Sequence, residues 1–205
     1  MHDRVIHMLS IKGFAKAEIL AEACDTAPDT IEGTLDALAK EALLETTRMG
    51  IKLTDQGKAR AEQLLQEQRE QGNSASLEEF YANFESVNAE YKQALADWQM
   101  RAGPDGPVPN DHSDDAYDGQ VKERMFVKHQ SLVDALHDLA PSWPLLAFYG
   151  VRLAKAFEKV ESGQQRYLAA PLIDSYHTVW FELHEALIRA SGRNRAEEAA
   201  AGRAV

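Results

Sequence analysis

The stretch "LAEACDTAPDTIEGTLDALAKEALL", residues 20–44, predicts two helices joined by a tight turn. The aspartate after the cysteine marks the turn, and Pro28 stands at a first helical position, where the missing N–H of proline costs nothing. Ile31, Leu35 and Leu38 then recur at spacings of four and three, which is typical of a helix with one buried face. The stretch therefore predicts a helix-turn-helix.

The segments on either side extend this unit. A short hairpin is predicted over residues 43–54, "LLETTRMGIKLT", because β-branched and alternating residues flank Met49-Gly50. Helices are predicted over residues 2–12, 15–24 and 54–71, the last with Thr54 as its N-cap. Residues 1–70 are therefore expected to form three helices plus a β-hairpin, with a further helix at the end.

Two segments of this unit resemble the winged helix-turn-helix domain of the multiple-antibiotic-resistance (MarR) and PadR-like regulators. Residues 20–44 resemble a support helix, a turn and a recognition helix, and "KLTDQGKA", residues 52–59, resembles the L-T-x-x-G end of the wing. The resemblance implies a recognition helix in the major groove of DNA and a wing beside it. The residues that it assigns to DNA binding are Thr30, Gly33, Thr34, Lys40, Arg48, Lys52 and Lys58.

The sequence departs from these families in charge and in layout. The exposed face of the expected recognition helix carries Asp29, Glu32 and Asp36, and carboxylates repel phosphates unless each meets a base donor or an arginine. A winged-helix unit that contacts a protein and does not read DNA is therefore kept as an alternative. Little chain precedes the first helix, so the layout is closer to PadR-like or GntR-like regulators, in which a helical domain follows.

Composition limits the compartment and the partners. The chain has 205 residues, with 22 Lys and Arg against 33 Asp and Glu, and a formal net charge of -11. This balance opposes loose binding to nucleic acid or to an anionic membrane, so contact with DNA needs a local basic patch. The single cysteine, Cys24, excludes an intramolecular disulfide. No secretion signal or long apolar run is readable, and we expect a soluble, cytoplasmic protein.

The second half is predicted to be an all-α helical bundle over residues 77–190. Residues 71–76 have the composition of a linker, Ser76 opens a capping box, and residues 102–114 form a Gly/Pro/Asp loop. Helices are expected over residues 77–101, 115–140, 144–160 and 171–190, followed by a flexible tail over residues 191–205. The fold class is therefore mostly α, a winged helix followed by a bundle.

The first bundle helix carries an aromatic stripe formed by Phe80, Phe84, Tyr91 and Trp98. Regulators with a winged helix usually bind two half-sites, so a homodimer is expected, and this stripe could form its interface. The same stripe could equally pack inside one bundle, and the sequence leaves both interpretations open.

The stretch "DSYHTVWFELHEAL", residues 174–187, places His177 and His184 on one helical face. Residues seven apart on a helix stand ~10 Å from each other, so both imidazoles cannot bind one metal ion. The residues that could line a pocket for an organic effector are Tyr176, His177, Trp180, His184 and His129. The alternative is that these histidines belong to the core, with their N–H groups satisfied by protein.

Motifs for catalysis are lacking. Residues 110–119, "NDHSDDAYDG", lack the sixth-position glycine and the closing glutamate of an EF-hand, and no phosphate loop or catalytic triad order is readable. A helical enzyme with a site at His177, His184 and Glu185 is the least favoured interpretation. The leading hypothesis is a dimeric DNA-binding transcriptional regulator that responds to a small effector, without enzymatic activity, metal or cofactor.

Overall fold

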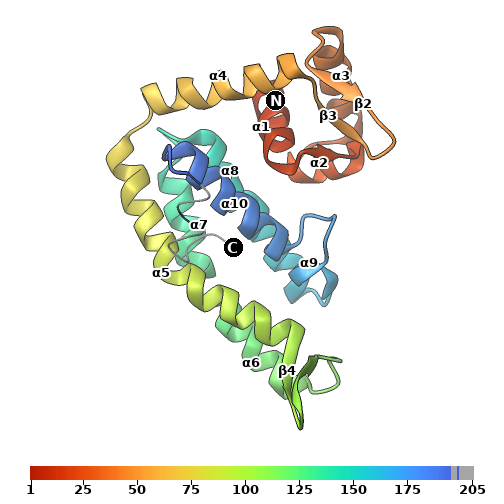
Figure 1. The fold of residues 1–205 in the computed structure, drawn as a ribbon, viewed down its shortest axis with the longest axis vertical. Coiled ribbons are helices and arrows are strands. Elements are labelled where there is room, and N and C mark those ends of the chain that lie inside the picture. The colour runs from red at the N-terminus through yellow and green to blue at the C-terminus, as the bar shows by residue number, and fades with distance from the viewer. Residues whose placement is uncertain (195–197, 199–205) are drawn as a thin grey trace.

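The computed structural model describes residues 1–194 and residue 198, and it is mostly helical (Figure 1). The elements of the first part are α1 (His2–Lys12), β1 (Phe14–Ala15), α2 (Ala17–Ala23), α3 (Pro28–Lys40), β2 (Leu44–Thr46), β3 (Ile51–Leu53) and α4 (Asp55–Gln71). The elements of the second part are α5 (Ser74–Gln99), β4 (Met100–Gly103), β5 (Gly106–Pro109), α6 (Asp115–Phe126), α7 (His129–Asp138), α8 (Pro144–Glu161), α9 (Arg166–Ala169) and α10 (Tyr176–Ala190). The mostly-α prediction is confirmed.

The first part closes around a small antiparallel sheet with the strand order β1-β3-β2. Leu44 pairs with Leu53, and Phe14 pairs with Lys52, so the strand β1 adds an edge that the sequence did not predict. The turn between β2 and β3 needs Gly50, whose φ of 141° disfavours other residues and whose added Cβ would lie 2.7 Å from the Ala15 carbonyl oxygen. The helices and the hairpin predicted for this part are present.

The predicted linker over residues 71–76 is wrong, because only Gly72 and Asn73 separate α4 from α5. The Asn73 side chain caps α5 by accepting hydrogen bonds from the Ala75 and Ser76 N–H groups, so the helix begins before the predicted capping box. The indole N–H of Trp143 donates to the Asn73 carbonyl at 3.0 Å, and an added Cβ on Gly72 would lie 2.5 Å from the Trp143 ring. The chain therefore bends tightly around Trp143.

Two predictions for the middle of the chain are also wrong. The expected loop over residues 102–114 begins with the β4–β5 hairpin, so the second part is not all α. The expected helix over residues 115–140 is broken at Val127 and Lys128, where Lys128 has a non-helical ψ of 5°. Packing explains the break, since α6 packs on α5 whereas α7 packs on α8.

Helix α10 starts later than the helix predicted over residues 171–190. Ser175 caps α10 and accepts a hydrogen bond from the Thr178 N–H, while Leu172 has a φ of 64° and is 80% exposed. Leu172 therefore lies outside the buried stripe of the helix. In the predicted tail, Arg193 packs over the Tyr81 ring at 4.0 Å, so this residue contacts α5. Residues 195–197 and 199–205 of that tail lie outside the described residues.

The two parts lie side by side. Figure 1 shows α4 leading from the first part to α5, which runs down one side of the second part to the β4–β5 hairpin. Helix α1 packs against both α4 and α10, which places α10 beside the first helix. Across the described part of the chain, no helix combines the length and the apolar character that crossing a membrane requires.

Candidate functional site

Helix α3 presents an acidic face to solvent. Asp29, Glu32 and Asp36 are exposed, as are Thr30, Gly33 and Lys40 from the predicted DNA-binding set. Thr34 from that set is buried, and its hydroxyl donates to the Thr30 carbonyl at 2.9 Å. Thr34 therefore supports the helix and does not offer its side chain to a partner.

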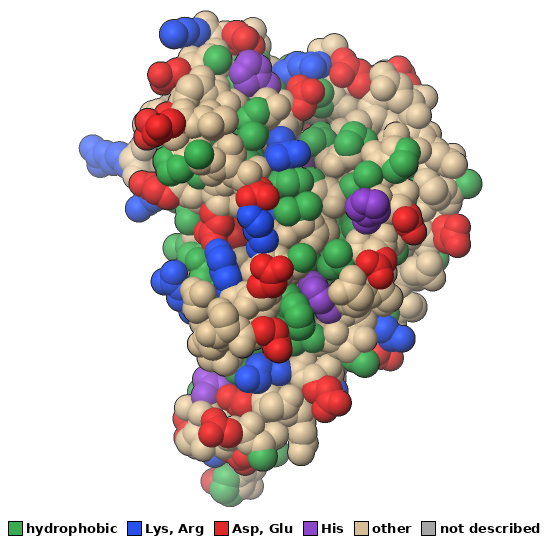
Figure 2. Space-filling model, turned by 180° about the vertical axis from the view of Figure 1, so that it is seen from behind, with side chains coloured by type: hydrophobic (Ala, Val, Ile, Leu, Met, Phe, Trp, Pro, Cys, Tyr) green, Lys and Arg blue, Asp and Glu red, His purple; other side chains and the backbone are tan. Residues whose placement is uncertain are grey.

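The cations near the β2–β3 turn differ in their partners. Lys52 pairs with Glu45 at 2.9 Å and Lys58 pairs with Asp55 at 2.8 Å, and the hydrogen bond to Asp55 raises the pKa of Lys58. Within the described residues, the exposed cations Arg48, Lys16 and Lys40 have no ion-pair partner. Figure 2 shows acidic and basic side chains intermixed on the face seen from behind.

Four of the five residues predicted to line an effector pocket meet inside the second part. The ring of Trp180 stacks on Tyr91 at 4.0 Å and packs against Phe84 at 5.0 Å. Tyr176 lies 6.1 Å from Trp180 and 5.6 Å from His129, between ring centroids. We call the rings of these residues, with those of Phe157 and His184, the aromatic stack: Phe84, Tyr91, His129, Phe157, Tyr176, Trp180 and His184.

Most polar atoms of the aromatic stack contact protein groups, whereas the Tyr91 hydroxyl is buried without a hydrogen-bond partner in the described residues. The Trp180 indole N–H donates to Asn88 Oδ1 at 2.9 Å, and His129 Nδ1 lies 3.2 Å from the Tyr176 hydroxyl. His184 Nε2 lies 3.1 Å from Glu85 Oε1. Burial lowers the pKa of His129 and raises that of Tyr176, so both side chains stay neutral near pH 7. These contacts favour the core interpretation for the four residues.

His177 stands apart from the aromatic stack. Its ring packs against Phe181 at 4.6 Å, and its Nδ1 atom is buried without a hydrogen-bond partner in the described residues. Asp174, one turn earlier, does not orient His177, because it is bound by Arg152 and Lys12.

The aromatic stripe on α5 is buried within this chain. Phe80, Phe84, Tyr91 and Trp98 are each no more than 8% exposed. Of the two interpretations left open by the sequence, packing inside one bundle accounts for this stripe, and it offers no surface to a second copy.

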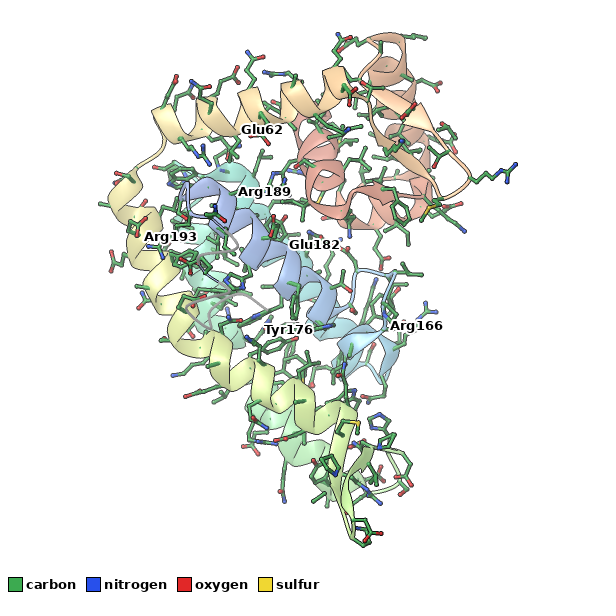
Figure 3. All side chains as sticks on the ribbon, in the orientation of Figure 1. Glu62, Arg166, Tyr176, Glu182, Arg189 and Arg193 are labelled. Atoms are coloured by element: carbon green, nitrogen blue, oxygen red, sulfur yellow. The ribbon has the colours of Figure 1, made fainter. Side chains whose placement is uncertain are left out.

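A cluster of four charged side chains lies where α1 meets α8 and α10, and we call it the ion-pair cluster: Lys12, Arg152, Asp174 and Glu182. The Arg152 guanidinium donates two hydrogen bonds of 2.7 Å to the Asp174 carboxylate and one of 2.6 Å to Glu182. Lys12 donates to Asp174 at 3.1 Å and to Glu182 at 2.7 Å. Figure 3 shows Glu182 on α10, near α1.

The charges of the ion-pair cluster balance. Burial by itself raises the pKa of Asp174, but Arg152 and Lys12 outweigh burial and hold the pKa below its ordinary value of 3.8. The side chain of Arg152 is 1% exposed, and the two carboxylates hold it in its charged form. Two cations and two anions that saturate each other are tolerated in an interior, whereas any three of them leave an unpaired charge.

The histidine His7 lies next to the ion-pair cluster. His7 Nε2 lies 3.1 Å from the Tyr149 hydroxyl, and the Arg152 guanidinium lies 5.0 Å from the Tyr149 ring. Burial, followed by the nearby charges of Arg152 and Arg189, lowers the pKa of His7 to about 3. His7 is therefore neutral at pH 7 and acts as a hydrogen-bonding group.

A hollow of about 460 Å³ opens beside the ion-pair cluster. Phe14 and Met49 from the first part face Leu172 and Ile173 from the second, while the polar side of the hollow includes Lys12 and Glu182. The turn between β2 and β3 therefore shares a surface with the segment before α10.

Sequence reasoning missed the ion-pair cluster. Its members lie up to 170 residues apart, so no local motif joins them. One signal was available: Arg152 occupies an inward position of an apolar helix, three residues after Tyr149 and four before Ala156, both of which are buried. A charge at such a position needs a buried partner.

The described residues were also compared with the requirements of a metal site. The described residues contain no group of three or more histidine, cysteine or carboxylate side chains that could hold a metal ion. Comparisons with protein-family models, with curated proteins and with solved structures return no match to this chain.

Proposed function

We propose that this chain is a DNA-binding transcriptional regulator whose residues 1–70 form a winged helix. The order of elements supports the proposal, because α1, β1, α2 and α3 precede the β2–β3 hairpin and α4 follows it. In a unit of this kind α3 is the recognition helix and the β2–β3 turn is the wing.

The observation that carries the proposal is the exposed wing tip next to an exposed helix face. Arg48 is exposed in the β2–β3 turn, and α3 leaves Thr30 and Gly33 open to solvent. An arginine at this place suits a phosphate contact, which positions a protein on DNA without reading sequence. The carboxylates of α3 are then restricted to accepting hydrogen bonds from bases such as cytosine.

The experiment is a selection of DNA duplexes from a randomised pool by the full chain, followed by fluorescence anisotropy at several salt concentrations. Arg48→Ala is expected to weaken binding to the selected duplex and to reduce the salt slope by about one. Lys128→Ala, an exposed cation at the break between α6 and α7, is the matched control and should leave binding unchanged. Failure to enrich any duplex, or full affinity in Arg48→Ala, refutes the proposal.

A protein-binding winged helix is the second candidate, favoured by the acidic face of α3. Asp29, Glu32 and Asp36 are exposed and have no ion-pair partner within the described residues. A basic surface on another protein would complement them. Charge reversal at Asp36 would abolish such binding, whereas it would strengthen binding to DNA.

We further propose that the regulator acts as a homodimer and responds to an effector. The ion-pair cluster supports transmission between the two parts, because it ties α1 directly to α8 and α10. Sedimentation of the full chain at micromolar concentration tests the dimer, and a monomer at that concentration argues against it.

A further inference from the structure

A second hollow, of about 690 Å³, lies between the start of α6, the end of α5 and α9. We call it the polar hollow and define it by Trp98, His112, Asp115, Lys122, Gln165 and Arg166. It is separate from the wing and from the ion-pair cluster, which lie around α1 and β1. Figure 1 shows α9 and the β4–β5 hairpin on the same side of the molecule.

One wall of the polar hollow holds a fixed imidazole. His112 Nδ1 lies 2.8 Å from Asp118 Oδ2, and the Trp98 ring covers the face of the imidazole at 4.3 Å. Asn110 braces the same carboxylate by donating to Asp118 Oδ1 at 2.8 Å, and its Oδ1 accepts the His112 backbone N–H at 3.2 Å. The orientation of His112 is therefore set by three neighbouring residues.

This arrangement decides which ring nitrogen carries hydrogen. A carboxylate accepts hydrogen bonds, so the hydrogen of the neutral imidazole lies on Nδ1 and points at Asp118. The Nε2 atom then has a free lone pair. Asp118 is buried and the His112 side chain is 42% exposed, so the open edge of the ring is the one opposite Asp118. That edge can accept a hydrogen bond from a hydroxyl group.

Two cations lie on the other walls of the polar hollow. Lys122 comes from α6 and Arg166 from α9, where Figure 3 labels it, and neither has an ion-pair partner in the described part of the chain. Asp115 offsets one of these charges. Asp118 also lines the hollow and carries a negative charge, but its oxygens are hydrogen-bonded by Asn110 and His112, and it forms no ion pair with Lys122 or Arg166.

We propose that the polar hollow binds a small anion that also carries a hydroxyl group, a phosphorylated alcohol or a hydroxy acid. The anionic group lies against Arg166 and Lys122, since guanidinium and ammonium groups bind phosphate and carboxylate oxygens. The hydroxyl donates to His112 Nε2, and Asp118 strengthens this acceptor by holding the proton on Nδ1. The proposal does not depend on DNA binding.

Isothermal titration calorimetry with the full chain tests the proposal with four probes: glycerol 3-phosphate, n-propyl phosphate, glycerate and propionate. At least one hydroxylated probe is expected to bind about tenfold more tightly than its analogue without the hydroxyl, since a hydrogen bond worth about 1.4 kcal/mol corresponds to a factor of ten. Preference for glycerol 3-phosphate assigns a phosphate ligand, and preference for glycerate assigns a carboxylate. Absence of saturable binding by all four at millimolar concentration overturns the proposal.

Two variants locate the binding. His112→Gln should weaken the hydroxylated probe about tenfold and leave its analogue unchanged, and Arg166→Gln should weaken both. His137→Gln, an exposed histidine on α7 away from the polar hollow, is the matched control and should bind as the unchanged chain does. If His112→Gln does not fold, Arg166→Gln still tests the proposal, because Arg166 is exposed. Unchanged affinity in Arg166→Gln, or in a folded His112→Gln, overturns the assignment.

Discussion

Two clusters in the interior are stabilised by different interactions, one by ion pairs and the other by aromatic packing. The ion-pair cluster joins α1 to α8 and α10 with four charges at distances of 2.6 to 3.1 Å. The aromatic stack packs α10 against α5, α7 and α8 with rings whose centroids lie 4.0 to 6.1 Å apart. Removing one member of a buried ionic cluster leaves an uncompensated charge, which lowers the free energy of unfolding strongly. Removing part of a ring loses only some of many weak contacts. A single substitution should therefore lower the free energy of unfolding more in the ion-pair cluster than in the aromatic stack.

The largest effect is expected from Arg152→Met. The substitution leaves Asp174 and Glu182 with Lys12 alone, one buried negative charge in excess. Breaking a buried ionic network by removing one member costs about 3 to 5 kcal/mol. Urea unfolding followed by circular dichroism measures the change in the free energy of unfolding.

A surface ion pair provides the control for this prediction. Arg124 pairs with Asp97 at 2.8 Å, and the Arg124 side chain is 51% exposed. Arg124→Met should cost less than about 1 kcal/mol, since exposed pairs contribute little. Equal losses in the two variants would contradict the view that Arg152 balances buried charge.

The pH dependence of stability is expected to come partly from His7, next to the ion-pair cluster. The folded pKa of His7 is about 3, below its ordinary value of 6.5, so the unfolded chain binds a proton between these values while the folded chain does not. Stability from this residue is complete above pH 6.5 and is lost as the pH falls toward 3, by on the order of 3 kcal/mol at pH 4. Melting temperatures of the unchanged chain and His7→Gln, measured from pH 7 to pH 4, should converge at the acid end.

The control for His7 is His2→Gln, at an exposed position of the same helix. The melting profile of this variant should run parallel to that of the unchanged chain. A His7→Gln profile that also runs parallel would show that His7 does not contribute to the acid sensitivity.

A smaller effect is expected from Trp180→Phe in the aromatic stack. A phenyl ring keeps most of the contact with Tyr91 and Phe84, but it removes the N–H that donates to Asn88 Oδ1 at 2.9 Å. The loss is expected to be about 1 to 3 kcal/mol, from the missing hydrogen bond and the smaller ring. Chemical unfolding of the variant measures it, and a loss as large as that of Arg152→Met would remove the contrast between the two interiors.

The difference between the aromatic stack and the ion-pair cluster also explains which part of the interior could be predicted from the sequence. Members of the aromatic stack on one helix recur at helical spacing, so the buried face of α10 was readable from Tyr176, Val179 and Leu183. The exposed Leu172 broke this pattern because Ser175 caps the helix after it. Periodicity identifies a buried face, and capping decides where it begins.

The ion-pair cluster and the polar hollow could not be predicted in this way. Lys12 and Asp174 are 162 residues apart in the chain, and only the packing of α1 on α10 brings them together. His112 and Asp118 are close in sequence, but their contact depends on a left-handed φ of 55° at His112. The sequence of residues 110–119 carries no local pattern that predicts this pair.

The smallest effect is expected from His177→Leu, which tests the difference between two histidines on one helix. His177 Nδ1 is buried without a hydrogen-bond partner in the described residues, whereas His184 Nε2 lies 3.1 Å from Glu85 Oε1. Leucine at position 177 removes an unsatisfied polar atom, so the free energy of unfolding should stay the same or rise by up to about 1 kcal/mol. His184→Leu removes a partner of Glu85 and should lower it by about 1 to 3 kcal/mol. Urea unfolding of both variants compares them directly, and a loss of that size in His177→Leu would mean that its Nδ1 is hydrogen-bonded and that His177 belongs to the core.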